Sequence, residues 1–189
     1  MVRHAGSGGF TLLEMLLVIV IFGFLVTLVA PKIDLQKFTV DSAMQSAGTT
    51  LLVAQRLAVT RQHNIIVAFD TAAEAIRILD DANNNAKADP GEHVRVVSLS
   101  EHVVFGLGGA PPLGAWAGPV SFTKTFGTMP AVTFHRDGSA SEAGAVYLTT
   151  TRAARGPGHA GDSRVIETER ATARVSWYRA APPTWKRGF

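Results

Sequence analysis

One stretch near the N-terminus restricts what this chain can fold into more than any other feature. From Phe10 to Ala30 the sequence reads FTLLEMLLVIVIFGFLVTLVA, which is apolar except for two threonines, one glycine and a single carboxylate, Glu14. A helix that rises ~1.5 Å per residue would reach about 31 Å over this run, the thickness of a hydrocarbon core. We therefore expect residues 10–30 to form a membrane-spanning helix.

Three kinds of N-terminal segment contain such a run: a cleaved secretory signal, a simple membrane anchor, and a helix used in assembly. A secretory signal has a shorter apolar core that ends at a small-residue cleavage site, whereas Pro31-Lys32 follows the run here. Arg3 precedes the run, so the short N-terminus should remain in the cytoplasm while the rest of the chain is exported.

Glu14 is the anomaly of the run. A carboxylate in hydrocarbon costs ~2.5–3.5 kcal/mol near the bilayer centre, so it usually has a cationic partner. The run contains no lysine or arginine, but a cut after Gly9 would create a free amino group at Phe10. The N-terminus of a neighbouring copy would then supply the cation. The alternative is a tolerated charge that reaches the membrane interface from one end of the span.

The segment GGFTLLEMLLVIVIFGFLVTLVAP, residues 8–31, resembles the leader junction and first helix of type IV pilins and type II secretion pseudopilins. This resemblance implies that prepilin peptidase cuts between Gly9 and Phe10, that Phe10 becomes N-methylated, and that Glu14 guides docking into the filament. Pro31 matches the proline at which that helix bends, since proline removes one helical hydrogen bond. The resemblance also implies a single-pass protein of the bacterial inner membrane with a periplasmic globular domain.

The segment after Pro31 has the pattern of an amphipathic helix. Apolar residues recur every three or four positions along one stripe, which consists of Met44, Ala47, Leu51, Ala54 and Ala58. We expect one long helix of about 50 residues that bends near Pro31 and packs its second half onto a sheet.

Beyond Gln62 the apolar period changes to two, which is typical of strands. We expect nine strands: 64–70, 74–79, 93–99, 102–106, 120–124, 131–135, 145–151, 164–169 and 173–179. The fold class is then α+β, with the long N-terminal helix packed on a mainly antiparallel β-sheet domain. The chain divides into a leader (1–9), a transmembrane and filament-core helix (10–30), its amphipathic continuation (31–62) and a β-rich domain (63–189).

Two stretches of the domain resemble the GspH/FimT group of minor pilin-like proteins. AQRLAVTRQHNIIVAFD, residues 54–70, is similar to the helix-to-strand junction of that group, and FHRDGSASEAGAVYLTT, residues 134–150, is similar to a later turn and strand. The resemblance implies a minor pseudopilin of the type II secretion system. Its partners would be other pseudopilins or pilins in a filament, prepilin peptidase, the inner membrane and the secretion-platform proteins.

The loop DDANNNAKADPGE has the oxygen spacing of a twelve-residue calcium site, because a hard cation needs six to eight oxygen ligands from a tightly wound chain. The candidate ligands are Asp81, Asn83, Asn85, the carbonyl of Lys87, Asp89 and Glu92. Ala86 stands where the sharp turn of such a site favours glycine, and the flanking segments read as strands rather than helices. We expect a polar turn without a cofactor, and Ca²⁺ binding is the alternative.

No pattern of catalytic residues accompanies these segments. The six histidines are scattered singly, and the chain has no cysteine and no Gly-x-Ser-x-Gly motif. We therefore expect no enzymatic activity. A plain membrane-anchored binding domain that keeps its leader is a third class of function.

The rival to a secretion pseudopilin is a FimT-like minor pilin of a type IV pilus or a DNA-uptake machine. In that case basic side chains near the C-terminus, Arg174 and Arg179, would contact phosphates. DNA-binding members of that group carry a Gly-Arg-x-Arg signature. The matching stretch here reads Ala-Arg-Val-Ser at residues 173–176, so DNA is not an expected partner.

Overall fold

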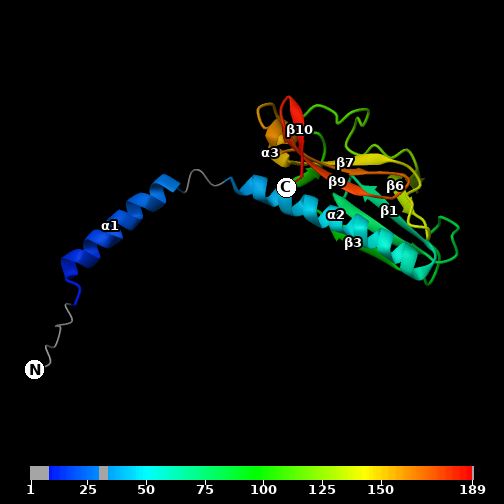
Figure 1. Cartoon of the computed structure of the whole chain (residues 1–189), viewed down its shortest axis with the longest axis horizontal. Coiled ribbons are helices and arrows are strands. Elements are labelled where there is room, and N and C mark those ends of the chain that lie inside the picture. Colours follow the sequence, from blue (N-terminus) through cyan, green and yellow to red (C-terminus); the bar gives the residue numbers. More distant parts are fainter. Residues whose placement is uncertain (1–8, 30–33, 189) are drawn as a thin grey trace, which may run out of the picture. The chain divides into compact units, whose positions relative to one another are not determined.

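The computed structural model describes residues 9–29 and 34–188. The chain divides into two compact units, Met1–Leu35 and Gln36–Phe189. The first unit contains helix α1 (Leu12–Val29), and the second contains all of the strands (Figure 1). Two predicted features fall outside the described residues: the leader up to Gly8, and Pro31 with the bend expected there.

Helix α1 is apolar on every side. None of its side chains from Leu12 to Thr27 is buried within its own unit, and Phe22 and Phe24 are 63% and 65% exposed. A helix of this kind requires apolar surroundings supplied from outside itself. In residues 9–29 and 34–188, no helix is both long and apolar enough to cross a membrane. The predicted span, 10–30, includes Ala30, which is not among the described residues.

The second helix, α2 (Leu35–Arg61), buries one stripe and exposes the opposite side. All five stripe residues predicted from the sequence, Met44, Ala47, Leu51, Ala54 and Ala58, are buried, so this prediction is confirmed. Helix α1 ends at Val29 and α2 begins at Leu35. The junction at which we expected the long helix to bend lies outside the described residues, so the single bent helix stays a prediction.

One sheet holds five antiparallel strands in the spatial order β3-β2-β1-β6-β5. Its strands are β1 (Asn64–Asp70), β2 (Ala75–Asp81), β3 (Val94–Ser98), β5 (Thr125–Phe126) and β6 (Met129–Phe134). The central strand is β1, where Val67 pairs with Ile78 on one side and Val132 on the other. Strand β3 forms one edge of this sheet.

The other sheet also has five antiparallel strands, in the order β10-β9-β8-β7-β4. Its strands are β4 (Val103–Phe105), β7 (Gly144–Thr150), β8 (Arg164–Thr168), β9 (Val175–Ala181) and β10 (Thr184–Arg187). A short helix, α3 (Thr151–Arg155), leaves the end of β7, and the Thr150 hydroxyl caps it by accepting a hydrogen bond from Ala153 N.

The α+β class is confirmed, with three corrections to the predicted strands. The strands form two sheets rather than one. The strand expected at 120–124 is absent, and Val120 makes only an isolated bridge to Val146. In this segment the Phe122 ring packs against Gly144 and Phe69 instead. Strands β5 and β10 were both missed: β5 has only two residues, and β10 follows Pro182 and Pro183 without an alternating pattern.

The main core lies where the stripe of α2 meets both sheets. It combines Met44 and Leu51 of the helix with Val67 of one sheet and Ile166 of the other. Figure 1 shows α2 running beside the strands of its unit. All residues of this core fall between Val40 and Val175, so the second unit contains its core entirely.

Candidate functional site

The predicted cleavage junction lies on an open part of the chain. Phe10 is 74% exposed, and Gly9 is also exposed. A Cβ atom added at Gly9 would meet no heavy atom within 4 Å. The described chain therefore leaves the Gly9–Phe10 bond accessible to a peptidase, and a larger side chain at Gly9 would disturb no internal contact.

Thr11 and Glu14 form the start of α1. The Thr11 hydroxyl accepts a hydrogen bond from Glu14 N at 3.2 Å, and Thr11 O accepts one from Met15 N at 3.1 Å. Thr-Leu-Leu-Glu is the sequence of a capping box, in which the first residue satisfies a free amide of the opening turn. A carboxylate in the first turn also interacts favourably with the helix dipole. The spacing of Thr11 and Glu14 could have revealed this cap from sequence alone.

Known proteins share this N-terminus. Residues 5–30 match the family model described as the prokaryotic N-terminal methylation motif. The N-terminus is therefore of the prepilin type. Over 85 residues the chain is 34% identical to pilin-like protein PilA1 of Thermus thermophilus. The match covers 44% of this chain and 54% of the relative, so the chain spans about half the length of that curated protein.

Two solved structures of the minor pseudopilin EpsH from the type 2 secretion system of Vibrio cholerae are also similar. Their TM-scores are 0.48 and 0.47, at 12% and 16% sequence identity. The likeness covers 76% and 79% of this chain and 96% and 99% of those chains. Scores this low carry no argument about function. The resemblance to pilin-like proteins is confirmed, whereas the individual roles of Gly9, Phe10 and Glu14 stay predictions.

The two arginines considered for nucleic-acid contact both form ion pairs with carboxylates. Arg174 Nε lies 3.4 Å from Glu169 Oε2, with both side chains well exposed. Arg179 Nη2 lies 3.2 Å from Asp41 Oδ2, and Arg164 Nε donates to Asp41 Oδ1 at 2.5 Å. Arg179 thus joins β9 to α2 and serves the packing of the domain, while Arg174 belongs to an exposed turn.

The loop proposed as a calcium site uses its oxygens to hold its own backbone. Asp81 is fully buried and accepts hydrogen bonds from Asn85 N and Ala86 N at 3.0 and 2.9 Å. Ala86 has a φ of 59°, so the left-handed turn forms there without glycine. Glu92 accepts from Ala82 N and from Asp89 N, both at 3.0 Å.

The remaining candidate ligands are joined by hydrogen bonds from amide groups to their side-chain oxygens, and these oxygens do not surround a common position for a cation. Asn83 Nδ2 and Asn85 Nδ2 donate to Asp89 Oδ2 at 2.7 and 2.6 Å, and these two hydrogen bonds lower the pKa of Asp89. Asn85 Oδ1 accepts from Lys87 N at 2.8 Å. Within the described chain, no group of three or more histidines and carboxylates is placed to hold a metal. Ca²⁺ binding by this loop stays the untested alternative to the polar turn that we expected from the sequence.

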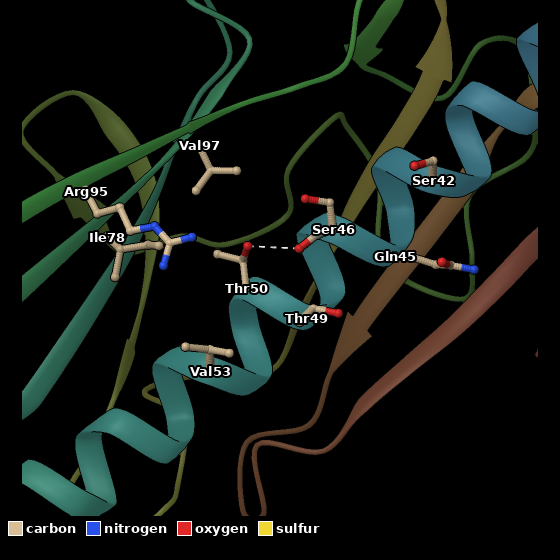
Figure 2. A pocket seen from close by; sticks show the side chains of 9 residues that line it. All are labelled: Ser42, Gln45, Ser46, Thr49, Thr50, Val53, Ile78, Arg95 and Val97. Atoms are coloured by element: carbon tan, nitrogen blue, oxygen red, sulfur yellow. Dashed lines mark hydrogen bonds between the residues drawn. The ribbon is translucent and has the colours of Figure 1, made fainter.

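A polar groove lies between α2 and the edge strand β3 (Figure 2). It has a volume of about 380 Å³. Figure 2 shows the hydroxyls of Ser42, Ser46 and Thr49 on the helix, with the Arg95 guanidinium on the strand side. Thr50 Oγ1 donates back to Ser46 O at 2.8 Å. The lining contains neither a histidine nor a carboxylate, so the groove offers hydrogen bonds to a partner but no nucleophile with its base.

Proposed function

We propose that this chain is a minor pseudopilin of the type II secretion system, which is processed by prepilin peptidase and built into the periplasmic pseudopilus. The observation that carries the proposal is the prepilin-type N-terminus, in which an accessible Gly9–Phe10 bond precedes a helix that is apolar on every side. In this proposal the division into leader, filament-core helix, continuation and β-rich domain is the one predicted from the sequence.

The proposed cycle begins in the inner membrane, with the N-terminus cytoplasmic and the domain periplasmic. Cleavage exposes the Phe10 amine, which is then methylated. Glu14 of one subunit neutralises the amine of a neighbour, and the α1 helices pack together as the filament core. In the filament this packing keeps the apolar side chains out of water, where exposure would cost roughly 25 cal/mol per Å². A carboxylate left unpaired in that core would penalise wrong registers. The role is structural, without catalysis.

A variant of Glu14 tests this proposal. We expect Glu14→Ala to be cleaved normally, because the junction itself is unchanged, but to enter filaments poorly. The measurements are the mass of the processed chain and the fraction of it that is recovered with isolated filaments. Unimpaired incorporation and secretion with Glu14→Ala would contradict the pairing of Glu14 with a neighbouring amine.

The second candidate is a FimT-like minor pilin of a type IV pilus or a DNA-uptake machine. Its support is the same N-terminus, together with the curated pilin-like relative. The ion pair between Arg179 and Asp41 weighs against DNA contact, because that guanidinium already contributes to the packing of α2 on β9. A gel-shift experiment at low and moderate salt separates the two candidates, since phosphate contacts weaken steeply with salt.

A further inference from the structure

A second hollow in the domain, of about 320 Å³, brings together two cations and a histidine from separate segments. Lys124 precedes β5, His135 follows β6, and Arg170 lies in the turn between β8 and β9. Ser139 and Ser141 complete the polar part of the wall. None of the residues that line this hollow is a carboxylate.

These groups present hydrogen-bond donors that the protein itself leaves available. Among the ion pairs of the described chain, none involves Lys124 or Arg170. Ser141 is only 7% exposed; its Oγ accepts from Thr133 N at 3.1 Å, and none of the described residues accepts its proton. His135 Nδ1 lies 3.0 Å from Asn64 Oδ1, so Nε2 is the ring nitrogen left for a ligand.

Backbone hydrogen bonds fix the walls in place. Ala140 N donates to Arg170 O at 2.8 Å, which ties the β8–β9 turn to the floor of the hollow. Ser141 N donates to Thr133 O at 2.8 Å, and His135 N donates to Ser139 O at 2.9 Å. A ligand would therefore meet donors that are already positioned, which limits the entropy lost on binding.

We propose that this hollow binds a single phosphate group through Lys124, Arg170 and Ser141. A tetrahedral oxyanion can accept from donors on several sides at once, and hydrogen bonds between an ionised donor and an oxyanion are the strong ones. The proposed filament assembly uses none of these residues, so the inference goes beyond it. The phosphate could be free or part of a lipid headgroup, since both present the same oxygens.

The surrounding charges favour one phosphate over a long polyanion. Glu169 pairs with Arg174, and hydrogen bonds from the hydroxyl and the amide of Ser139 lower the pKa of Asp137. Burial by itself would raise the pKa of Glu142, but hydrogen bonds from Lys124 N and from Thr123 bring it below its usual value. With these carboxylates beside it, the hollow is a local group of cations rather than an extended positive surface, which suits one phosphate better than a nucleic acid.

Titration calorimetry tests the proposal on the processed full-length chain in a nonionic detergent. The probe is inorganic phosphate, with acetate at the same ionic strength as the comparison. We expect phosphate to bind and acetate to bind much more weakly. Lys124→Gln and Arg170→Gln should each weaken phosphate binding by about tenfold, as expected for the loss of one charge-assisted hydrogen bond. Both side chains are exposed, so neither change should affect folding.

Matched controls are Lys186→Gln and Arg155→Gln, two exposed cations that do not line the hollow and should leave phosphate binding unchanged. Vesicles of phosphatidic acid, compared with phosphatidylcholine, identify the source: binding that is lost in the two hollow variants assigns the phosphate to a headgroup. The proposal is overturned if millimolar phosphate produces no heat and the vesicles do not bind. It is also overturned if acetate binds equally well, or if the control variants lose as much affinity as the hollow variants.

Discussion

Glu14 contributes to the first turn of α1, in addition to any contact that it makes in a filament. It lies in the first turn of a helix whose amide at that residue is satisfied by the Thr11 hydroxyl. An N-cap of this kind is worth about 1 kcal/mol, and glutamine can replace glutamate in a capping box. The helix-starting role and the proposed pairing role can therefore be separated by two different substitutions.

We expect Glu14→Gln to impair filament incorporation nearly as much as Glu14→Ala, because it keeps the capping geometry but removes the charge. Thr11→Ala removes the cap and keeps the carboxylate, so its incorporation should stay close to that of the unaltered chain. The measurement is the fraction of each variant that is recovered with filaments. Normal incorporation of Glu14→Gln, together with a defect in Thr11→Ala, would assign Glu14 to helix formation alone.

Gly48 is a residue whose role emerged only from the structure. The sequence marks it as a weak point of a helix, because glycine in a helix costs about 1 kcal/mol relative to alanine. In the fold, a Cβ atom at this position would lie 2.2 Å from Trp177 Nε1. Glycine therefore allows α2 to approach the indole of β9.

We expect Gly48→Ala to destabilise the domain despite the gain in helix propensity, since overpacking a core costs about 1–3 kcal/mol. Urea unfolding of the fragment Gln36–Phe189 measures the effect. Gly156→Ala is the matched control, because Gly156 has extended backbone and a Cβ there meets nothing within 4 Å. A stabilised Gly48→Ala variant would show that Trp177 can move aside freely.

At the scale of elements, the Asp41 carboxylate of α2 forms ion pairs with two strands, β8 and β9. Asp41 accepts from Arg164 of β8 and also pairs with Arg179 of β9. The Arg164 side chain is 4% exposed, and its Nη1 donates to two backbone carbonyls as well. Removal of Asp41 would leave this buried guanidinium without a carboxylate.

We expect Asp41→Ala to lower the free energy of unfolding by about 3–5 kcal/mol, the range for removal of one partner from a buried ion pair. Glu169→Ala is the matched comparison: it removes the partner of exposed Arg174 and should cost about 0–1 kcal/mol. Denaturant unfolding of the fragment Gln36–Phe189 gives both values. Equal losses would mean that the Asp41 pair is no stronger than a surface pair.

The hairpin of β1 and β2 contains an acid-sensitive contact. Hydrogen bonds from Ala73 N and then from the Arg77 guanidinium lower the pKa of Asp70 from its ordinary 3.8. Because the pKa of Asp70 is lower in the folded state than in the unfolded state, the stabilisation is complete above pH 3.8. It is lost as the pH falls through the folded-state pKa.

Accordingly, the difference in free energy of unfolding between the unaltered domain and Asp70→Asn should be largest near neutral pH and should decrease progressively below pH 3.8. Urea midpoints measured across that range test this. Glu101→Gln, at an exposed position in a turn, serves as the control and should show no such decrease. A difference in free energy of unfolding that increases on acidification would contradict a lowered pKa of Asp70 in the folded state.

The elements that the sequence predicted well are those in which local pattern and tertiary packing agree. Strand β1 has the predicted bounds, 64–70, because it is central and buried along its length. In the segment 120–124 apolar and polar residues alternate as in a strand, yet the Phe122 ring stacks on Phe69 in the core, with ring centroids 5.6 Å apart. Lys124 and His135 flank the β5–β6 hairpin, whereas Arg170 lies in the turn between β8 and β9, so only the fold could bring all three together.

At the scale of the whole molecule, two units of different character share one chain. The domain from Gln36 onward buries its own core, whereas α1 exposes apolar side chains on every side. Such a helix is unfavourable in water, and large exposed apolar surfaces mark interaction sites. The proposal assigns that site to neighbouring subunits in a filament, and it depends on removal of the leader.

Mass spectrometry of the chain purified from a host that has prepilin peptidase tests this dependence most directly. We expect a mature protein that begins at Phe10 and carries one methyl group on its new amino terminus. A Gly9→Leu variant should remain uncut, because Gly9 touches nothing in the described chain and the change affects only recognition by the peptidase. A native chain that still begins at Met1 would contradict assembly through Phe10 and Glu14.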